Sequence, residues 1–261
     1  MDACPPAPPS DPKDDSAGRT LRDGVSDGLE PLETLDLGRV ASIDDLVRGM
    51  GATAFAARSL GEGADVLEAM VRDPDCFVVC TLSGAMTIAK MGLVLCDMID
   101  GGWIQAIVST GALMAHGFIE ATGRRHFKYD PRFDDAELYE RGYDRVYDTL
   151  ELEQSLDDVE PIVRMVLEGL EPGRPYGSHE LHDRLGKWLE ENGAGRGILA
   201  SAHRAGVPVY VPAFTDSELG LDVALHRRRC RREGREPPRH DGFRDLEAYA
   251  EQVARAPRIG I

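Results

Sequence analysis

Small and polar residues follow three apolar runs of the sequence, where parallel strands would end. These residues are Ser83-Gly84-Ala85 after the run 77–82, Ser109-Thr110-Gly111-Ala112 at the end of the run 104–109, and Thr215-Asp216 after the run 207–212. Small side chains let a phosphate approach backbone amides, hydroxyl groups donate hydrogen bonds to it, and an aspartate accepts hydrogen bonds from ribose or binds an ammonium group. The three places together predict a nucleotide site. Tight packing without a ligand is the alternative, and the sequence contains no G-x-G-x-x-G fingerprint.

Three further features allow two interpretations each. His116 lies in the helical pattern after Thr110-Gly111, where it would be a proton donor or polar ligand of the site or a satisfied core or surface histidine. Asp222 would help to bind a polyamine or be a solvated acid on a helix surface. The seven arginines within 227–239 resemble a nucleic-acid patch, but in an acidic chain they are expected to pair with its own acids or with a neighbouring subunit.

Candidates for covalent catalysis are few. No G-x-S-x-G motif is present, and the four lysines are Lys13, Lys90, Lys128 and Lys187. Neither Lys13, in a polar arm, nor Lys187, among acids, has the desolvated setting that lowers the pKa of an imine-forming amine. We therefore expect no catalytic nucleophile in this chain.

The five cysteines predict free thiols rather than a metal centre. They are scattered, and the pair Cys76 and Cys80 is separated by apolar residues of an expected strand, without a second pair at zinc spacing. We expect no metal site, and buried free thiols favour a reducing cytoplasm.

The spacing of apolar residues predicts an α/β fold. Two apolar strands in succession each lead through a small-residue turn into a helix, which requires crossovers and a parallel sheet with helices on both faces. The expected strands are 77–82, 104–109 and 207–212, and another begins at Arg258. Helices are predicted at 42–60, 62–72, 86–99, after 110–112, and at 134–142, 153–170, 178–192, 196–205, 219–229 and 244–255. The charged segment 124–150 is expected to run over the surface.

Composition limits the class of protein. Acidic residues number 46 against 30 basic residues, giving a net charge of −16, which disfavours general binding of nucleic acid or anionic membranes. No apolar stretch is long enough to span a bilayer, and the N-terminus lacks the features of a secretion signal or transit peptide. Residues 1–33, rich in Pro, Asp, Gly and Ser, are predicted to be a disordered arm before a domain at 34–261. Because the last run stops as a strand begins, we expect a fragment or one half of a split protein.

The motifs at the strand ends resemble those of the deoxyhypusine synthase family, in particular its bacterial deoxyhypusine synthase-like branch. FVVCTLSGAMTIAKMG, AIVSTGALMAHGF and VPVYVPAFTDSELG occur in the family's order, and the segment from Pro212 to Gly220 is the most specific because members show P-A-x-T-D-x-x-L-G after a buried strand. The resemblance covers residue 36 to the end of the chain.

The resemblance implies a Rossmann-like homotetramer that uses NAD. Such enzymes transfer the 4-aminobutyl group of spermidine, through an imine on a lysine, to a protein lysine. Ser83, Gly84 and Ala85 match the first NAD-binding turn, and Thr110, Gly111 and Ala112 match the second. His116 falls where members contact NAD and polyamine, and Asp216 matches an NAD-contacting aspartate.

The chain departs from the family pattern in two places. Members carry a polyamine-binding acid directly after the glycine of L-G-D, whereas here Leu221 intervenes before Asp222. The family's GGG loop, its polyamine-contacting histidine and its imine-forming lysine follow the strand that begins at Ile259, so we expect this chain alone to be inactive. With a free diamine as acceptor the activity would be that of a homospermidine synthase. A different hypothesis is a noncatalytic NAD-binding subunit paired with a complete paralogue.

Overall fold

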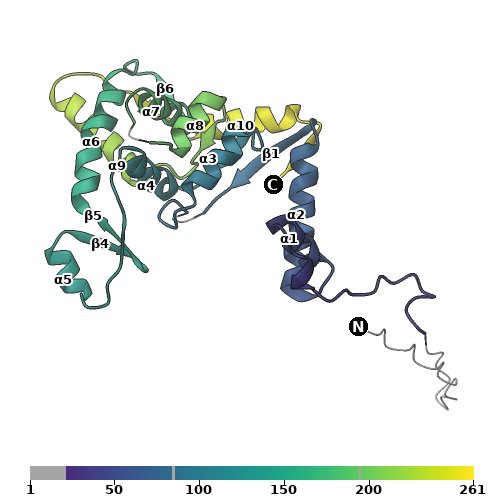
Figure 1. The fold of residues 1–261 in the computed structure, drawn as a ribbon. Helices are drawn as coiled ribbons and strands as arrows, with labels where there is room; N and C mark the ends of the chain where they lie inside the picture. The colour runs from purple at the N-terminus through teal and green to yellow at the C-terminus, as the bar shows by residue number, and fades with distance from the viewer. Residues whose placement is uncertain (1–21, 84–85, 194) are drawn as a thin grey trace, which may run out of the picture. The chain divides into compact units, whose positions relative to one another are not determined.

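The computed structural model describes residues 22–83, 86–193 and 195–261. Its internal contacts divide the chain into two compact units, one that ends at Glu68 and one that runs from Ala69 to Ile261. This division falls within a helix (Figure 1). Residues 1–21 of the predicted arm 1–33 lie outside the described residues, and residues 22–33 form no helix or strand. The boundary of the arm at residue 34 stays a prediction.

The first unit is built around two helices. After the short 3-10 helix η1 (Leu37–Arg39), α1 spans Ile43–Gly51 and α2 begins at Phe55 and continues to Arg72. Ser42 and Asp45 form a capping box that fixes the start of α1. The prediction of one helix over 42–60 is wrong, because the chain turns between Gly51 and Phe55. A Cβ on Gly61 would lie 2.4 Å from the Cα of Gly51, so this glycine pair lets the two backbones touch.

The second unit contains a parallel sheet, as predicted. Its strands are β1 (Cys76–Thr81), β2 (Ala106–Val108), β7 (Val209–Tyr210) and β9 (Arg258–Gly260). All neighbours pair in parallel in the order β7-β2-β1-β9. Along the chain, β2 is added on one side of β1 and β7 beyond it, whereas β9 is added on the other side of β1. The strand order therefore reverses between β1 and β9. Ligands of open parallel sheets bind beside the carboxyl ends of the strands, at such reversals.

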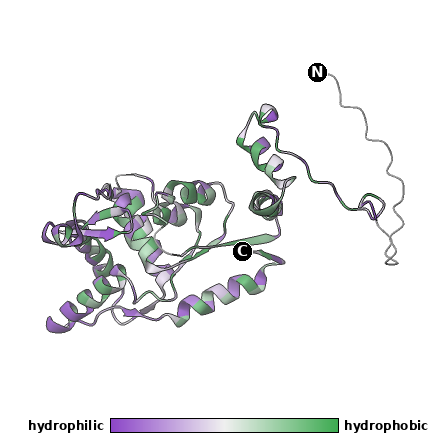
Figure 2. Cartoon of the chain, turned by 90° about the horizontal axis from the view of Figure 1, so that it is seen from below, coloured by the Kyte–Doolittle hydropathy of each residue, from purple (hydrophilic) through white to green (hydrophobic). Residues whose placement is uncertain are grey.

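Helices flank the parallel sheet. The helices of this unit are α3 (Gly92–Asp100), α4 (Gly111–Ala121), α5 (Asp135–Glu140), α6 (Glu153–Glu168), α7 (Ser178–Asn192), α8 (Ile198–Ala205), α9 (Glu218–Arg232) and α10 (Phe243–Arg255). Of these, α5 lies apart from the parallel sheet, beside the strand that follows it (Figure 1). Figure 2 shows that apolar residues dominate strand β1, which is labelled in Figure 1, whereas most helices carry both apolar and polar residues. Ile107 of β2 and Leu113 and Phe118 of α4 are fully buried in the core. The predicted ranges of α6 to α10 are confirmed to within a few residues. No helix of the described ranges is long and apolar enough to cross a membrane.

Two predictions about the connecting segments are wrong. The helix expected from residue 86 starts only at Gly92, because Lys90 adopts a left-handed backbone conformation (φ 65°) and the N–H of Met91 donates to the carbonyl of Met86 in a turn. The segment 124–150 contains the predicted helix α5, but it also contributes to a small sheet. This antiparallel sheet has the order β3-β5-β4 and comprises β3 (Phe127–Lys128), β4 (Tyr143–Val146) and β5 (Thr149–Leu152).

A third, two-stranded sheet pairs β6 (Pro175–Tyr176) with β8 (Arg239–His240). Both this pair and the antiparallel sheet consist of strands of two to four residues. So short a strand has no readable alternation of apolar and polar residues, and its partner lies elsewhere in the sequence. For this reason the sequence pattern did not reveal either sheet.

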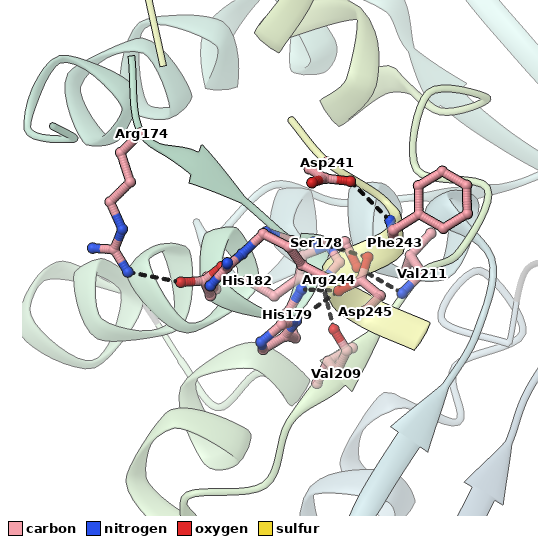
Figure 3. Close-up of polar contacts among 12 residues, drawn as sticks. Arg174, Ser178, His179, His182, Val209, Val211, Asp241, Phe243, Arg244 and Asp245 are labelled. Atoms are coloured by element: carbon pink, nitrogen blue, oxygen red, sulfur yellow. Dashed lines mark hydrogen bonds and ion pairs between the residues drawn. The ribbon is translucent and has the colours of Figure 1, made fainter. Parts of the chain in front are cut away.

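A buried aspartate fixes the end of strand β7 through helix α7 (Figure 3). Asp245 of α10 accepts hydrogen bonds from the backbone N–H groups of Ser178 and His179 and lies 2.6 Å from the His179 ring. Ser178 Oγ in turn accepts a hydrogen bond from the N–H of Val211, directly after β7. Burial would raise the pKa of Asp245, but these hydrogen bonds outweigh it and hold the pKa below its usual value. The aspartate therefore remains charged where it stabilises α7.

Replacement of Asp245 is expected to destabilise the chain. In Asp245→Ala two buried N–H groups and a histidine lose their acceptor, which should lower the free energy of unfolding by about 3 kcal/mol in urea denaturation. Glu247→Ala, an exposed acid on the same helix, should change it by less than ~0.5 kcal/mol. Equal effects of the two variants would contradict the assigned role.

Candidate functional site

Parallel pairing brings the ends of β1, β2 and β7 to one edge of the sheet. Thr81 pairs with Val108, and Val108 pairs with Tyr210. Beyond the strands the alignment continues, because the N–H of Leu82 donates to the carbonyl of Val108 and that of Ser109 donates to the carbonyl of Tyr210. The polar residues after each strand therefore start from neighbouring positions on the same edge.

The turn after β2 has features of an anion site. Thr110 is the N-cap of α4 but makes no side-chain capping hydrogen bond, so the helix start offers free backbone N–H groups and a partial positive charge. Ser109 is 8% exposed, and its Oγ is buried without a hydrogen-bond partner. An unsatisfied hydroxyl beside a free helix N-terminus suits a polar ligand that accepts hydrogen bonds.

The turns after β2 and β7 touch each other. A Cβ on Gly111 would lie only 2.0 Å from the Cβ of Ser217, so a glycine is required at this contact. Ser217 also caps α9, since its Oγ accepts a hydrogen bond from the N–H of Gly220. The exposed Asp216 precedes this residue directly and is therefore held near the start of α4.

The predicted cofactor residues can now be located. Ser83, Thr110 and Asp216 are exposed at the carboxyl edge, while Gly111 is buried and Ala112 half-buried at the start of α4. The predicted Gly84 and Ala85 lie outside the described residues. The first turn does not lead into a helix as expected, because α3 starts only at Gly92. Of the described helices that follow β1, β2 and β7, α4 begins nearest to the end of its strand.

Asp222 is buried, and its interpretation as a solvated surface acid is wrong. The residue is 5% exposed, and its Oδ2 makes no hydrogen bond. Burial, and then the negative charges of Glu218 and Glu160, raise the pKa of Asp222 to about 7. A cationic ligand would restore the charged form of this carboxylate.

Other acids lie close to the start of α9. Burial raises the pKa of Glu218, and the charges of Glu151, Asp144 and Asp157 raise it further, whereas His116 lowers it. Repulsion among carboxylates is relieved by a cation, so this end of α9 is suited to an amine.

His116 belongs to a network that sequence reasoning missed. Its Nδ1 lies 2.8 Å from Oε2 of Glu151 in β5, and Oε1 of the same carboxylate lies 3.0 Å from Nε2 of His126. Nδ1 of His126 lies 3.0 Å from Oε1 of Glu120, which also pairs with Lys90. His126 and Glu151 are brought together by the pairing of β3 with β5 in the small antiparallel sheet. Because this pairing is long-range, no local spacing in the sequence indicated these two residues.

The network holds opposite charges in a buried setting. Burial would raise the pKa of Glu151, but the contacts with His116 and His126 prevail and lower the pKa to about 2. Burial would likewise lower the pKa of His126, but Glu120 and Glu151 raise it to about 9. In the absence of a ligand, His126 is thus a cation between two carboxylates.

The arginine-rich stretch is partly neutralised by the chain itself. Arg229 lies 3.5 Å from Glu160, Arg235 lies 2.5 Å from Glu233, and Arg239 lies 3.4 Å from Glu236. These pairs agree with the expectation that the arginines serve the chain's own acids.

Asp222→Asn is expected to stabilise the folded chain more at about pH 8 than at about pH 5. Because folding raises the pKa of Asp222 from ~4 to about 7, its contribution to stability is complete below pH ~4 and is lost as the pH rises through 7. Asparagine carries no charge, so the free energy of unfolding of the variant relative to the wild type should increase by about 1–3 kcal/mol between the two pH values. Urea denaturation at both pH values measures this difference in the free energy of unfolding. Glu191→Gln, on the surface of α7, should show no such increase, and an equal shift in both variants would disprove the assignment.

Similarity to known proteins extends over most of the chain. The family model described as deoxyhypusine synthase matches residues 45–261. The chain is 34% identical over 199 residues to a deoxyhypusine synthase-like protein of Chlorobaculum parvum, covering 76% of this chain and 56% of the relative. It is 33% identical over 210 residues to a Methanosarcina thermophila protein named "Probable deoxyhypusine synthase", covering 80% of this chain and 63% of the relative. The chain thus spans little more than half of the length of such relatives.

A solved structure shares the fold. The chain superposes on a crystal structure described as that of "a putative deoxyhypusine synthase from Entamoeba histolytica" with a TM-score of 0.62 and 11% identity, covering 87% of this chain and 77% of the other. The parallel sheet with flanking helices and the family match over most of the sequence lead to one conclusion: the chain belongs to the deoxyhypusine synthase family.

Proposed function

We propose that this chain is the NAD-binding part of an enzyme that transfers the 4-aminobutyl group of spermidine to an amine acceptor. The observation that carries the proposal is the convergence of an unsatisfied Ser109 hydroxyl, the free N-terminus of α4 and Asp216 at one edge of the sheet. Membership of the deoxyhypusine synthase family supports NAD and a polyamine as the ligands of this edge.

The residues at this edge fit a dinucleotide. The hydroxyls of Ser83, Ser109 and Thr110 and the N–H groups at the start of α4 would bind phosphate oxygens, and Asp216 would accept hydrogen bonds from ribose. Gly84, Ala85, Gly111 and Ala112 are proposed to let the backbone approach the ligand, as the family resemblance implies. When bound, NAD would supply the hydride acceptor for oxidation of an amine-bearing carbon.

The acids around α9 fit the other substrate. Asp222 has a buried oxygen without a partner, and Glu218 is surrounded by further carboxylates, so both would hold the ammonium groups of spermidine or a related polyamine. His116 lies in α4 and acts electrostatically on Glu218, and the family resemblance implies that it would contact both ligands. The imine-forming lysine is proposed to come from outside these residues, so that this chain alone is inactive.

The acceptor and the setting are also proposals. The enzyme of which this chain is proposed to be part is expected to act in the cytoplasm as a homotetramer, without nucleic acid or membrane as a partner. Incubation of that enzyme with spermidine, NAD and labelled putrescine separates the acceptors. Labelled homospermidine would identify a homospermidine synthase, and its absence while spermidine is oxidised would leave a protein lysine. Failure to oxidise spermidine at all would favour a noncatalytic NAD-binding subunit.

Gly111→Ala is expected to weaken NAD binding to the chain at least ~10-fold in calorimetric titration. The added Cβ would lie 2.0 Å from Ser217 and push apart the turns after β2 and β7, which must converge on one ligand. Gly63→Ala, where a Cβ meets nothing within 4 Å, is the matched control and should bind NAD like the wild type.

Ser109→Ala tests the same site with a smaller change. It removes only the unpartnered hydroxyl, and loss of one hydrogen bond should weaken NAD binding by about fivefold without loss of stability. Undiminished NAD binding in both variants would disprove the proposed site, as would the absence of NAD binding to the wild type.

A further inference from the structure

Three potential metal ligands converge beside α4. They are Nδ1 of His116 in α4, Nε2 of His126 just before β3, and the carboxylate of Glu151 in β5. All three ligand atoms lie within 4.8 Å of one another. The residues are distant in the sequence, and the antiparallel sheet brings them together.

One of the two contacts within this group is not a hydrogen bond. Nδ1 of His116 is buried and makes no hydrogen bond, although Oε2 of Glu151 is only 2.8 Å away. The two atoms are close but poorly aligned for a shared proton. The side chain of His126 is fully buried and that of Glu151 is 3% exposed, so water does not readily complete the site from their side.

An outer carboxylate orients one of the histidines. Oε1 of Glu120 lies 3.0 Å from Nδ1 of His126 and Nζ of Lys90 lies 3.1 Å from the same nitrogen, so these two groups contact the outer side of the ring while Nε2 faces Glu151. Ligating histidines in proteins usually have a carboxylate in this position. Lys90 pairs with Glu120 and balances its charge, so the negative charge of Glu151 remains available to a cation.

We propose that His116, His126 and Glu151 bind a divalent transition-metal ion of the Zn²⁺ type. Two imidazoles and one carboxylate suit Zn²⁺, whereas Mg²⁺ and Ca²⁺ prefer oxygen ligands throughout. His116 is 18% exposed, more than the other two ligands, so a water molecule as fourth ligand would reach the ion from the side of His116. The bound ion would link the antiparallel sheet to α4. This metal site is independent of the proposed function, which requires no metal.

Equilibrium dialysis of the chelator-treated chain against Zn²⁺, followed by metal analysis, tests the site without any enzyme assay. The wild type should retain about one ion per chain. His126→Gln and Glu151→Gln should bind it at least ~100-fold more weakly, and Glu120→Gln about 10-fold more weakly, because that residue acts only through His126. His203→Gln is the matched control: His203 also pairs with a carboxylate, Asp183 at 2.6 Å, but belongs to no such group of three among the described residues.

A second measurement does not depend on the folding of variants. The Co²⁺-loaded wild type should show paramagnetically shifted proton signals from two imidazoles. Absence of a retained ion in the wild type, unchanged binding in both ligand variants, or signals from fewer than two imidazoles would each overturn the proposal. NAD binding measured on the same samples keeps this result separate from the proposed function.

Discussion

The parallel pairing of β1, β2 and β7 is the constraint on which the candidate site depends. Strands that run in the same direction must end at the same edge, and the register from Thr81 through Val108 to Tyr210 brings their ends level. The contact between Gly111 and Ser217 then joins two of the turns. A shift of β7 by one residue would turn Tyr210 out of the core and separate Asp216 from the start of α4.

Charge gives this edge its chemical character. One side of it offers hydrogen-bond donors at the N-terminus of α4, whereas the start of α9 gathers carboxylates that repel one another and make Asp222 hard to ionise. A phosphate group would accept hydrogen bonds from the N-terminus of α4, and a cationic amine would neutralise the carboxylates at the start of α9. The His116–Glu151–His126 network couples α4 to the small antiparallel sheet.

The sequence predicted what is local or periodic. Apolar runs indicated the four strands, and the residues after them indicated Ser83, Thr110 and Asp216 as neighbours at one edge. Burial of Asp222 could not be predicted, because it depends on packing of α9 rather than on spacing along it. His126 and Glu151 were missed for a related reason: strands of two to four residues carry no periodic signal, so the sheet that joins these residues to His116 exists only as long-range pairing. The left-handed Lys90 likewise ended a helical pattern that looked continuous.

The most direct test of the account is an NMR titration of the isotope-labelled chain with NAD, read at the backbone amides. The account predicts that the amide signals of Ser109, Gly111 and Ala112, together with that of Asp216, move first and most, because these groups lie at the converging strand ends. Shifts confined to the opposite edge of the sheet, at Gly206 to Val209 before and within β7, would contradict it, as would the absence of any shift.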